Sequence, residues 1–267
     1  MNRRAFLTST VTAGAAGLAA ALPGHAAQPA APGQREYYEL RRYQLRRGAK
    51  QKLFDDYVSQ AAIPAMNRAG VKPIGVFNVM LGPDSPSVYV LIRYESLEQF
   101  ATASDRMRSD EEYRRLAAPY TDLPATDPGY IRVESSLMVA FEGMPKLEVP
   151  SGVAEKKPRI FELRIYESHS KKANKKKIEM FNIGEIAIFR RTGLTPVFFG
   201  ETLIGTRLPN LTYLLVFDDL AARDKAWSTF VADPEWKTLS TTPGYTDPEI
   251  VSNISNVLLR PTSYSQI

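Results

Sequence analysis

The sequence contains no cysteine and only two histidines, His25 and His169. Without cysteine the chain can form neither a disulfide nor a cysteine-ligated iron–sulfur cluster. A zinc site built from cysteine and histidine needs three or four such side chains, so this class of site is excluded in practice. We therefore expect no metal site and no bound cofactor.

The sequence also lacks a long hydrophobic run. Its best candidate, residues 11–22, is rich in Ala and Gly and is too short and too weakly apolar to anchor a mature protein in a bilayer. An export consensus precedes this run at Arg3, Arg4, Phe6 and Leu7. Small residues then end at Ala26 in a typical cleavage pattern, so residues 1–26 are predicted to be a twin-arginine signal peptide. A disordered basic tail and a retained anchor are the alternatives. We expect a periplasmic or exported protein with no stable membrane anchor after cleavage.

The excess of positive charge is small. The formal net charge is +5, and it falls to +3 if cleavage after Ala26 removes two arginines and no acids. This excess argues against nucleic acid as a partner. The basic run 171–177 has no interleaved aromatic residues, so we interpret it as the solvated start of a helix.

One motif occurs twice. Residues 38–43 (Tyr-Glu-Leu-Arg-Arg-Tyr) return at 161–166 (Phe-Glu-Leu-Arg-Ile-Tyr), 123 positions later. The same offset relates the pairs Gly70/Gly193, Pro73/Pro196, Gly82/Gly205, Pro86/Pro209, Leu91/Leu214, Leu97/Leu220, Asp110/Asp233 and Glu112/Glu235. The chain is therefore predicted to contain a duplicated unit of about 100 residues, a normal size for a small domain.

Apolar periodicity and turn residues predict the same order of elements in each unit. Strands are expected at 36–45, 71–81, 88–94 and 127–140, and again at 159–167, 196–204, 210–218 and 250–259. Helices are expected at 53–69, 97–108 and 111–116, and again at 175–192, 222–232 and 234–239. Pro64 should kink or divide the first helix, Gly70 and Gly193 should end helices, and Ser96 should cap one.

This order, β-α-β-β-α-β, is the ferredoxin-like motif and gives an α+β fold class. A linker is predicted at 27–35, the first repeat at 36–142, a second linker at 143–158 and the second repeat at 159–262. Each unit covers one face of its sheet with helices and leaves the other face open. We therefore expect the two repeats to pack sheet to sheet as an α/β barrel within one chain.

Strand alternation divides the repeated motif into two faces. We assign Tyr38 and Leu40, with Phe161, Leu163 and Ile165, to the helix side. The barrel interior should then receive Glu39, Arg41, Tyr43, Glu162, Arg164 and Tyr166. Buried charges of this kind need partners, so these residues are either ion pairs that set the register of the two sheets or the lining of a ligand cavity. Duplication favours the ion pairs, because an interface uses both copies whereas a catalytic site needs one.

Two further side chains are candidates for chemistry. His169 follows the first strand of the second unit and could act as a general base, although a loop histidine bonded to backbone is the interpretation we favour. Glu201 stands where the first unit has Asn78 and is a candidate for an inward-facing acid.

Taken together, these motifs resemble the NIPSNAP family. The resemblance rests on Glu-Leu-Arg-x-Tyr at the start of each unit, the Gly-x-x-Pro spacing, Tyr94 to Leu97 and Phe217 to Leu220, and Asp233-Pro234-Glu235-Trp236. The first unit departs from the last motif, with Asp110-Glu111-Glu112-Tyr113. The resemblance implies a dimeric α/β-barrel fold, shared with antibiotic-biosynthesis monooxygenases, haem-degrading enzymes and chlorite dismutases. It implies no agreed catalytic residues. The haem-using relatives need an axial histidine on a helix, and His169 follows a strand, which counts against haem.

Three functions remain open at this point. The first is a module that binds a small organic ligand or a partner, with a homo-oligomer as one possible form. The second is a cofactor-independent monooxygenase or isomerase that uses an inward Tyr or Glu as its acid or base. The third is a structural or interaction protein whose barrel is filled with side chains.

Overall fold

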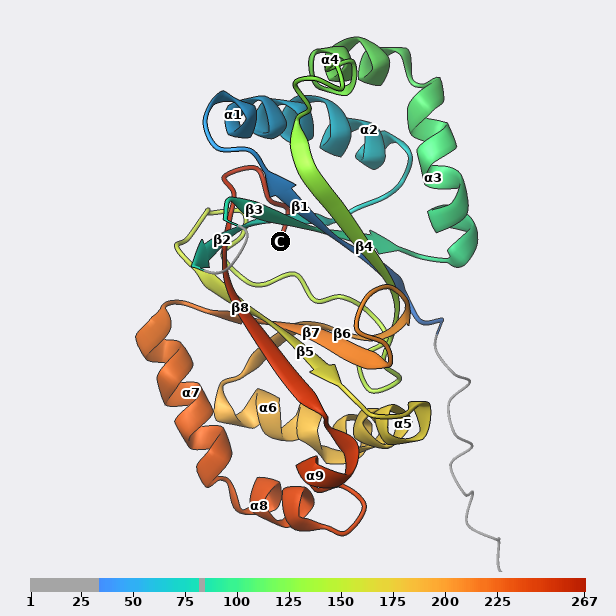
Figure 1. Ribbon diagram of the computed structural model, residues 1–267. Coiled ribbons are helices and arrows are strands. Elements are labelled where there is room, and N and C mark those ends of the chain that lie inside the picture. The colour runs from blue at the N-terminus through green and yellow to red at the C-terminus, as the bar shows by residue number, and fades with distance from the viewer. Residues whose placement is uncertain (1–33, 82–84) are drawn as a thin grey trace, which may run out of the picture. The chain divides into compact units, whose positions relative to one another are not determined.

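The computed structural model describes residues 34–81 and 85–267, which form two repeats (Figure 1). The first contains β1 (Tyr37–Leu45), α1 (Ala49–Asp56), the π-helical η1 (Tyr57–Ala62), α2 (Ile63–Arg68), β2 (Ile74–Leu81), β3 (Ser87–Tyr94), α3 (Leu97–Ser109), α4 (Glu111–Thr121) and β4 (Tyr130–Ala140). The second contains β5 (Ile160–Glu167), α5 (Lys171–Met180), the π-helical η2 (Phe181–Glu185), α6 (Ile186–Thr192), β6 (Thr195–Ile204), β7 (Asn210–Phe217), α7 (Leu220–Ala232), α8 (Pro234–Thr241), α9 (Asp247–Ile250) and β8 (Asn253–Pro261). The predicted order of elements is confirmed in both repeats, and α9 is an additional short helix that was not predicted. The predicted signal peptide lies outside the described residues.

The ends of the helices follow from the capping residues. Ser96 accepts a hydrogen bond from the backbone N–H of Gln99 at 3.1 Å, as predicted. Asp219 does the same for Ala222 at 2.8 Å, at the start of α7. Gly193 ends α6 with a φ of 88°, a left-handed conformation that glycine adopts without strain. No helix in the described part of the chain is both long enough and apolar enough to cross a bilayer.

Both repeats widen their first long helix into a π-helical segment. The helix of the first repeat divides next to Pro64, as expected, with η1 directly before α2. The second repeat has η2 in the corresponding place, although Ala187 stands where the first repeat has Pro64. The wide turn is therefore a property of the repeat and does not require the proline. Such segments are rare in helices and often lie at functional sites.

Eight strands of the described residues close into a barrel in the order β1-β3-β2-β8-β5-β7-β6-β4. The two sheets join edge to edge at two antiparallel seams. β2 pairs with β8 from Phe77 opposite Pro261, and β4 pairs with β6, where Val139 lies opposite Glu201. Closure leaves no sheet edge exposed, so the duplication supplies each half with the partner that its edge strands need.

The expected orientation of the repeated motif is wrong. Tyr38, Phe161 and Leu163 lie in the apolar cluster that fills the barrel, and Leu40 packs against it. Glu162 contacts side chains of α7 instead of the barrel interior. The alternating residues that were assigned to the barrel interior therefore face the helices: Glu39, Arg41, Tyr43, Glu162, Arg164 and Tyr166. Figure 1 shows α1–α4 on the outer side of the first repeat's strands and α5–α9 on that of the second.

The cause of this reversal is that both faces of β1 and β5 are buried. Alternation separates the two sets of side chains, but it does not say which set meets the helices. Apolar residues fill the barrel because it is closed and dry, whereas the buried charged residues need polar partners. Strand residues Tyr94 and Ser135 provide them in the first repeat, and α7 provides them in the second. The ion pairs also form within each repeat, so they do not set the register between the two sheets.

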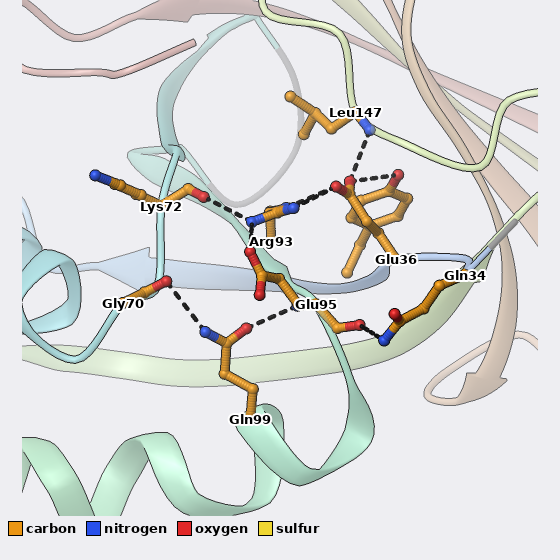
Figure 2. Close-up of polar contacts among 9 residues, drawn as sticks. Gln34, Glu36, Gly70, Lys72, Arg93, Glu95, Gln99 and Leu147 are labelled. Carbon is orange, nitrogen blue, oxygen red and sulfur yellow. Dashed lines mark hydrogen bonds and ion pairs between the residues drawn. The ribbon is translucent and has the colours of Figure 1, made fainter.

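A further buried carboxylate fastens the inter-repeat linker to the first repeat (Figure 2). Arg93 donates to Glu36 through Nε at 2.8 Å and Nη2 at 2.6 Å, and the backbone N–H of Leu147 donates to the same carboxylate at 2.8 Å. Leu147 packs against the apolar cluster inside the barrel. The network therefore holds the linker at the end of the barrel where β1 begins.

Candidate functional site

In the first repeat, the charged pair of the repeated motif is buried under the helices. Glu39 is 5% exposed. Arg41 donates to it through Nε at 2.6 Å and Nη2 at 2.8 Å, while the hydroxyls of Tyr94 and Ser135 donate at 3.0 and 2.8 Å. Four donors satisfy the carboxylate, and Nη1 is the end of the guanidinium that Glu39 does not hold.

Two cavities flank Arg41 in this layer. One, of about 540 Å³, is bordered by Glu39, Arg41, Tyr43, Tyr57, Tyr120, Thr121, Leu123, Pro128, Gly129, Tyr130, Val133 and Ser135. The other, of about 590 Å³, is bordered by Arg41, Tyr57, Met66, Tyr94, Ala103, Ser104, Met107, Arg108, Tyr113, Arg114, Ala117, Thr121 and Asp122. Arg41, Tyr57 and Thr121 border both, so the motif residue Arg41 stands between two spaces of ligand size.

Tyrosines form much of the cavity walls. The rings of Tyr57 and Tyr120 stack with centroids 4.6 Å apart and planes at 12°. The hydroxyl of Tyr57 lies 3.2 Å from that of Tyr113. Tyr120 is 8% exposed, and its hydroxyl has no hydrogen-bond partner within the described residues. A buried polar atom of this kind, beside a cavity, is a ready donor or acceptor for a bound molecule.

Burial and pairing set the charge state of this layer. Burial raises the pKa of Glu39, but the hydrogen bonds and positive charge of Arg41 outweigh it, so the pKa lies below its usual range. Burial raises the pKa of Tyr43, Tyr57 and Tyr120 above the ordinary value. At neutral pH the pair therefore borders the cavities as a carboxylate and a guanidinium beside neutral phenols, and Arg108, Arg114 and Asp122 add further charges to the larger cavity.

The second repeat holds the same motif with different partners. Glu162 is fully buried. It accepts from Arg164 at 3.0 Å, from Arg223 at 2.9 and 2.8 Å, and from the indole N–H of Trp227 at 2.8 Å. Arg164 also donates to the hydroxyl of Tyr166 at 3.0 Å. Burial raises the pKa of Glu162, and the bonds from Arg223 and Trp227 lower it by more, so the group stays ionised.

Large aromatic side chains lie between the sheet and the helices of the second repeat. Applying the 123-residue offset, Trp227 stands where the first repeat has Ser104, Phe230 where it has Met107, and Trp236 where it has Tyr113. The rings of Phe230 and Trp236 have centroids 4.3 Å apart, and the Arg164 guanidinium lies 4.4 Å from the Trp227 ring. The two repeats have therefore kept the motif and diverged in the volume beside it.

Sequence reasoning missed the buried ion pair between Lys177 and Glu185. The two side chains are 1% and 2% exposed, with Nζ and Oε2 3.3 Å apart. Burial raises the pKa of Glu185, with partial compensation by Lys177. Lys171, Lys172 and Lys175 of the basic run are exposed as predicted, but Lys177 faces inward. The apolar residues Ile178 and Phe181 beside Lys177 were the signal in the sequence from which its inward orientation could have been predicted.

The two remaining candidates lie elsewhere. His169 is exposed in the turn between β5 and α5. Glu201 lies on the helix side of β6, where it accepts from Lys175 at 2.7 Å, so the expectation that it faces the barrel interior is wrong. Neither residue borders the cavities beside Arg41. Within the described residues, no group of three His, Asp or Glu side chains could hold a metal ion.

A closed barrel made from two ferredoxin-like repeats, with helices outside it, defines an α+β protein of the dimeric α/β-barrel class. The chain belongs to the NIPSNAP family, whose model matches residues 38–136 and 161–266. The two matched stretches begin at the two copies of the motif described above.

Solved structures support the fold. Two are named "putative monooxygenase": one from Fusobacterium nucleatum (TM-score 0.55, 9% identity, 86% of this chain and 93% of that chain) and one from Lactobacillus acidophilus (TM-score 0.56, 9% identity, 85% and 94%). An uncharacterized NIPSNAP-like domain protein from Burkholderia xenovorans is 25% identical over 42% of this chain and 91% of its own, with a TM-score of 0.38. No curated protein matches the sequence.

Proposed function

We propose that this protein binds a small organic molecule in the first repeat, in the space between sheet and helices on either side of Arg41. One observation carries the proposal. The repeated Glu-x-Arg-x-Tyr motif borders open cavities in the first repeat, while aromatic side chains occupy the equivalent space in the second. In the described part of the chain, the cavities that the charge pair borders lie in the first repeat and have the usual scale of ligand sites, about 300–1,000 Å³. A cavity of about 470 Å³ over Trp227 in the second repeat is bordered by neither Glu162 nor Arg164.

The cavity walls indicate the chemistry of the ligand. Stacked tyrosine rings favour a flat, partly aromatic molecule. Arg41 can donate through Nη1 to an oxygen of the ligand while Glu39 holds the rest of the guanidinium in place. The unpartnered hydroxyl of Tyr120 supplies a second polar contact. We therefore infer an aromatic compound with a carbonyl, phenol or carboxylate group.

Native mass spectrometry of protein purified from its own host tests this proposal. The expected result is a second mass above that of the mature chain, which disappears on denaturation. The released compound should raise the melting temperature when it is added back. Recovery of bare protein whose melting temperature no aromatic acid or phenol raises would contradict the proposal and favour a structural role.

A second candidate function is a cofactor-independent monooxygenase or isomerase acting at the same place. The observation that favours it is Tyr120, a buried phenol beside the cavity with no hydrogen-bond partner in the described residues. Burial raises the pKa of this phenol, so it stays protonated at neutral pH and can donate a hydrogen bond to an oxyanion that develops on a substrate. The test is incubation of the released compound with wild type and Tyr120→Phe. Conversion by the wild type that falls at least tenfold in the variant, with binding retained, supports an enzyme. A compound recovered unchanged contradicts it.

We also propose that the chain is exported by the twin-arginine pathway, on the strength of Arg3 and Arg4 and the weakly apolar run that follows them. Replacing both arginines by lysine should leave the precursor in the cytoplasm, as followed by cell fractionation and immunoblotting. Undiminished delivery to the periplasm would contradict this assignment.

A further inference from the structure

A second candidate site lies inside the barrel, at the end where β1 and β5 finish. A cavity of about 340 Å³ opens there, bordered by inward-facing side chains of both repeats. It is separate from the cavities beside Arg41, which lie on the opposite face of the first sheet. Arg42, Tyr89 and Glu134 come from the first repeat, and Arg207 and Ser255 from the second.

The barrel interior changes character along its length. Near the start of β1 it is apolar, with Tyr38, Phe161 and Met138 in one cluster and the linker residue Leu147 against it. Toward the other end, inward positions become polar. Leu40 is followed on the same face by Arg42, and Met138 is preceded by Ser136 and Glu134. The cavity is therefore a polar pocket with an apolar floor.

Among the described residues that border this pocket, two arginines and one glutamate carry charge. Arg42 pairs with Glu134 at 3.2 Å. Arg207 donates through Nη1 to the neutral hydroxyl of Ser255 at 3.0 Å, and no ion pair to Arg207 occurs within the part of the chain that the structure describes. Both arginines lie near Tyr89: burial raises the pKa of this phenol, and the two positive charges oppose the shift.

The backbone holds Arg207 in an unusual conformation. Its φ of 60° lies in the left-handed region, which residues other than glycine seldom adopt without a compensating contact. The buried amide of Asn210 supplies that contact, because its Nδ2 donates to the carbonyls of Thr206 at 2.9 Å and Arg207 at 3.1 Å. The Oδ1 of Asn210 accepts in turn from Thr202 at 2.6 Å.

The same loop reaches across the seam between the repeats. A Cβ at Gly205 would clash with the hydroxyl oxygen of Ser136 on β4, so only glycine permits this approach. The loop is thus fixed both to its own strand and to the first repeat. Arg207 is thereby preorganised over the pocket, which lowers the entropic cost of binding.

We propose that this pocket binds a small, hydroxylated organic acid, with its oxyanion between Arg42 and Arg207 and its hydroxyls toward the serines and Asn256 at the rim. The oxyanion is a carboxylate or a phosphate ester, and both chemistries satisfy the same two guanidinium groups. The site needs both repeats, since neither supplies two arginines alone.

Isothermal titration calorimetry of the mature chain tests the proposal with three probes: gluconate, glucose 6-phosphate and uncharged glucose. We expect at least one of the two acids to bind and glucose not to bind. Arg207→Asn keeps a residue that tolerates the left-handed backbone but removes the charge. It should weaken binding at least tenfold, and Arg207→Lys should weaken it less.

Arg106→Ala, on the exposed surface of α3, is the matched control and should bind as the wild type does. Ser104→Trp should also bind normally, because it alters only the cavity beside Arg41; this separates the pocket from the function proposed above. Binding of neither acid at millimolar concentration, equal binding of glucose, or unchanged affinity in a folded Arg207→Asn variant would overturn the proposal.

Discussion

At the scale of single residues, the duplicated glutamate and arginine are conserved in role and supported by different neighbours. Glu39 relies on Arg41, Tyr94 and Ser135. Glu162 relies mainly on Arg223 and Trp227. In both repeats the carboxylate is buried, so its negative charge is stabilised only by its hydrogen-bond donors. Those donors must remain in place when a ligand enters or leaves.

Arg41→Ala should destabilise the protein by about 3 kcal/mol, because it leaves the Glu39 carboxylate buried without its main partner. The free energy of unfolding in urea measures the effect. The double variant Glu39→Gln with Arg41→Met should recover much of the loss, since no buried charge remains. A single variant as stable as the wild type would show that Arg41 contributes little to folding.

The pKa of Glu39 also predicts how stability depends on pH. Its pKa is lowered in the folded state, so its contribution is present above the ordinary value of about 4.3 and is lost as the pH falls below it. The wild type should exceed Glu39→Gln in unfolding free energy by about 2 kcal/mol at pH 7, and the difference should shrink toward pH 3. A difference that is constant with pH would contradict the assignment of charge.

At the scale of elements, the order of strands and helices could be predicted from the sequence. Which face of each strand meets the helices, and which meets the barrel interior, could not. Alternation in β1 separates Tyr38 and Leu40 from Glu39 and Arg41, and both sets are buried. Charged residues usually mark the solvent side, yet here neighbouring strands supply Tyr94 and Ser135 in the first repeat, and α7 supplies Arg223 in the second. Those partners are distant in sequence. The larger of the two cavities beside Arg41 depends on side-chain volumes at Ser104 and Met107, which no pattern of a single sequence encodes.

The junction of α5 and η2 offers a test of a buried ion pair. Lys177→Met should cost about 3 kcal/mol, because Glu185 then lies buried without a cation. Adding Glu185→Leu should restore stability to near the wild-type value or above it. Thermal and urea unfolding of the two variants would check this. If the double variant is as unstable as the single one, the pair holds the π-helical turn itself in shape.

At the scale of the whole barrel, the two seams should make the repeats unfold together. Both tryptophans, Trp227 and Trp236, lie in the second repeat, so fluorescence reports on that half. If unfolding is cooperative, Arg41→Ala in the first repeat should lower the urea midpoint of tryptophan fluorescence as much as that of far-ultraviolet circular dichroism. A fluorescence midpoint that stays at the wild-type value would show that the halves unfold separately.

The duplication also allowed the two halves to specialise. One half fills the space under its helices with Trp227, Phe230 and Trp236, and the other leaves cavities there. A filled layer stabilises through aromatic burial, while an open layer gives up part of that stability and gains a place for a ligand. The central claim is therefore that the first repeat is the binding half.

Ser104→Trp tests this claim most directly, because it places in the first repeat the side chain that the second repeat has at Trp227. Ala101→Trp, at an exposed position on the same helix, is the control. Native mass spectrometry should show the bound compound in the wild type and in Ala101→Trp, and bare protein in Ser104→Trp with an unchanged or higher melting temperature. Full occupancy in Ser104→Trp would contradict the account, because the ligand would then lie outside the cavity that Ser104 borders.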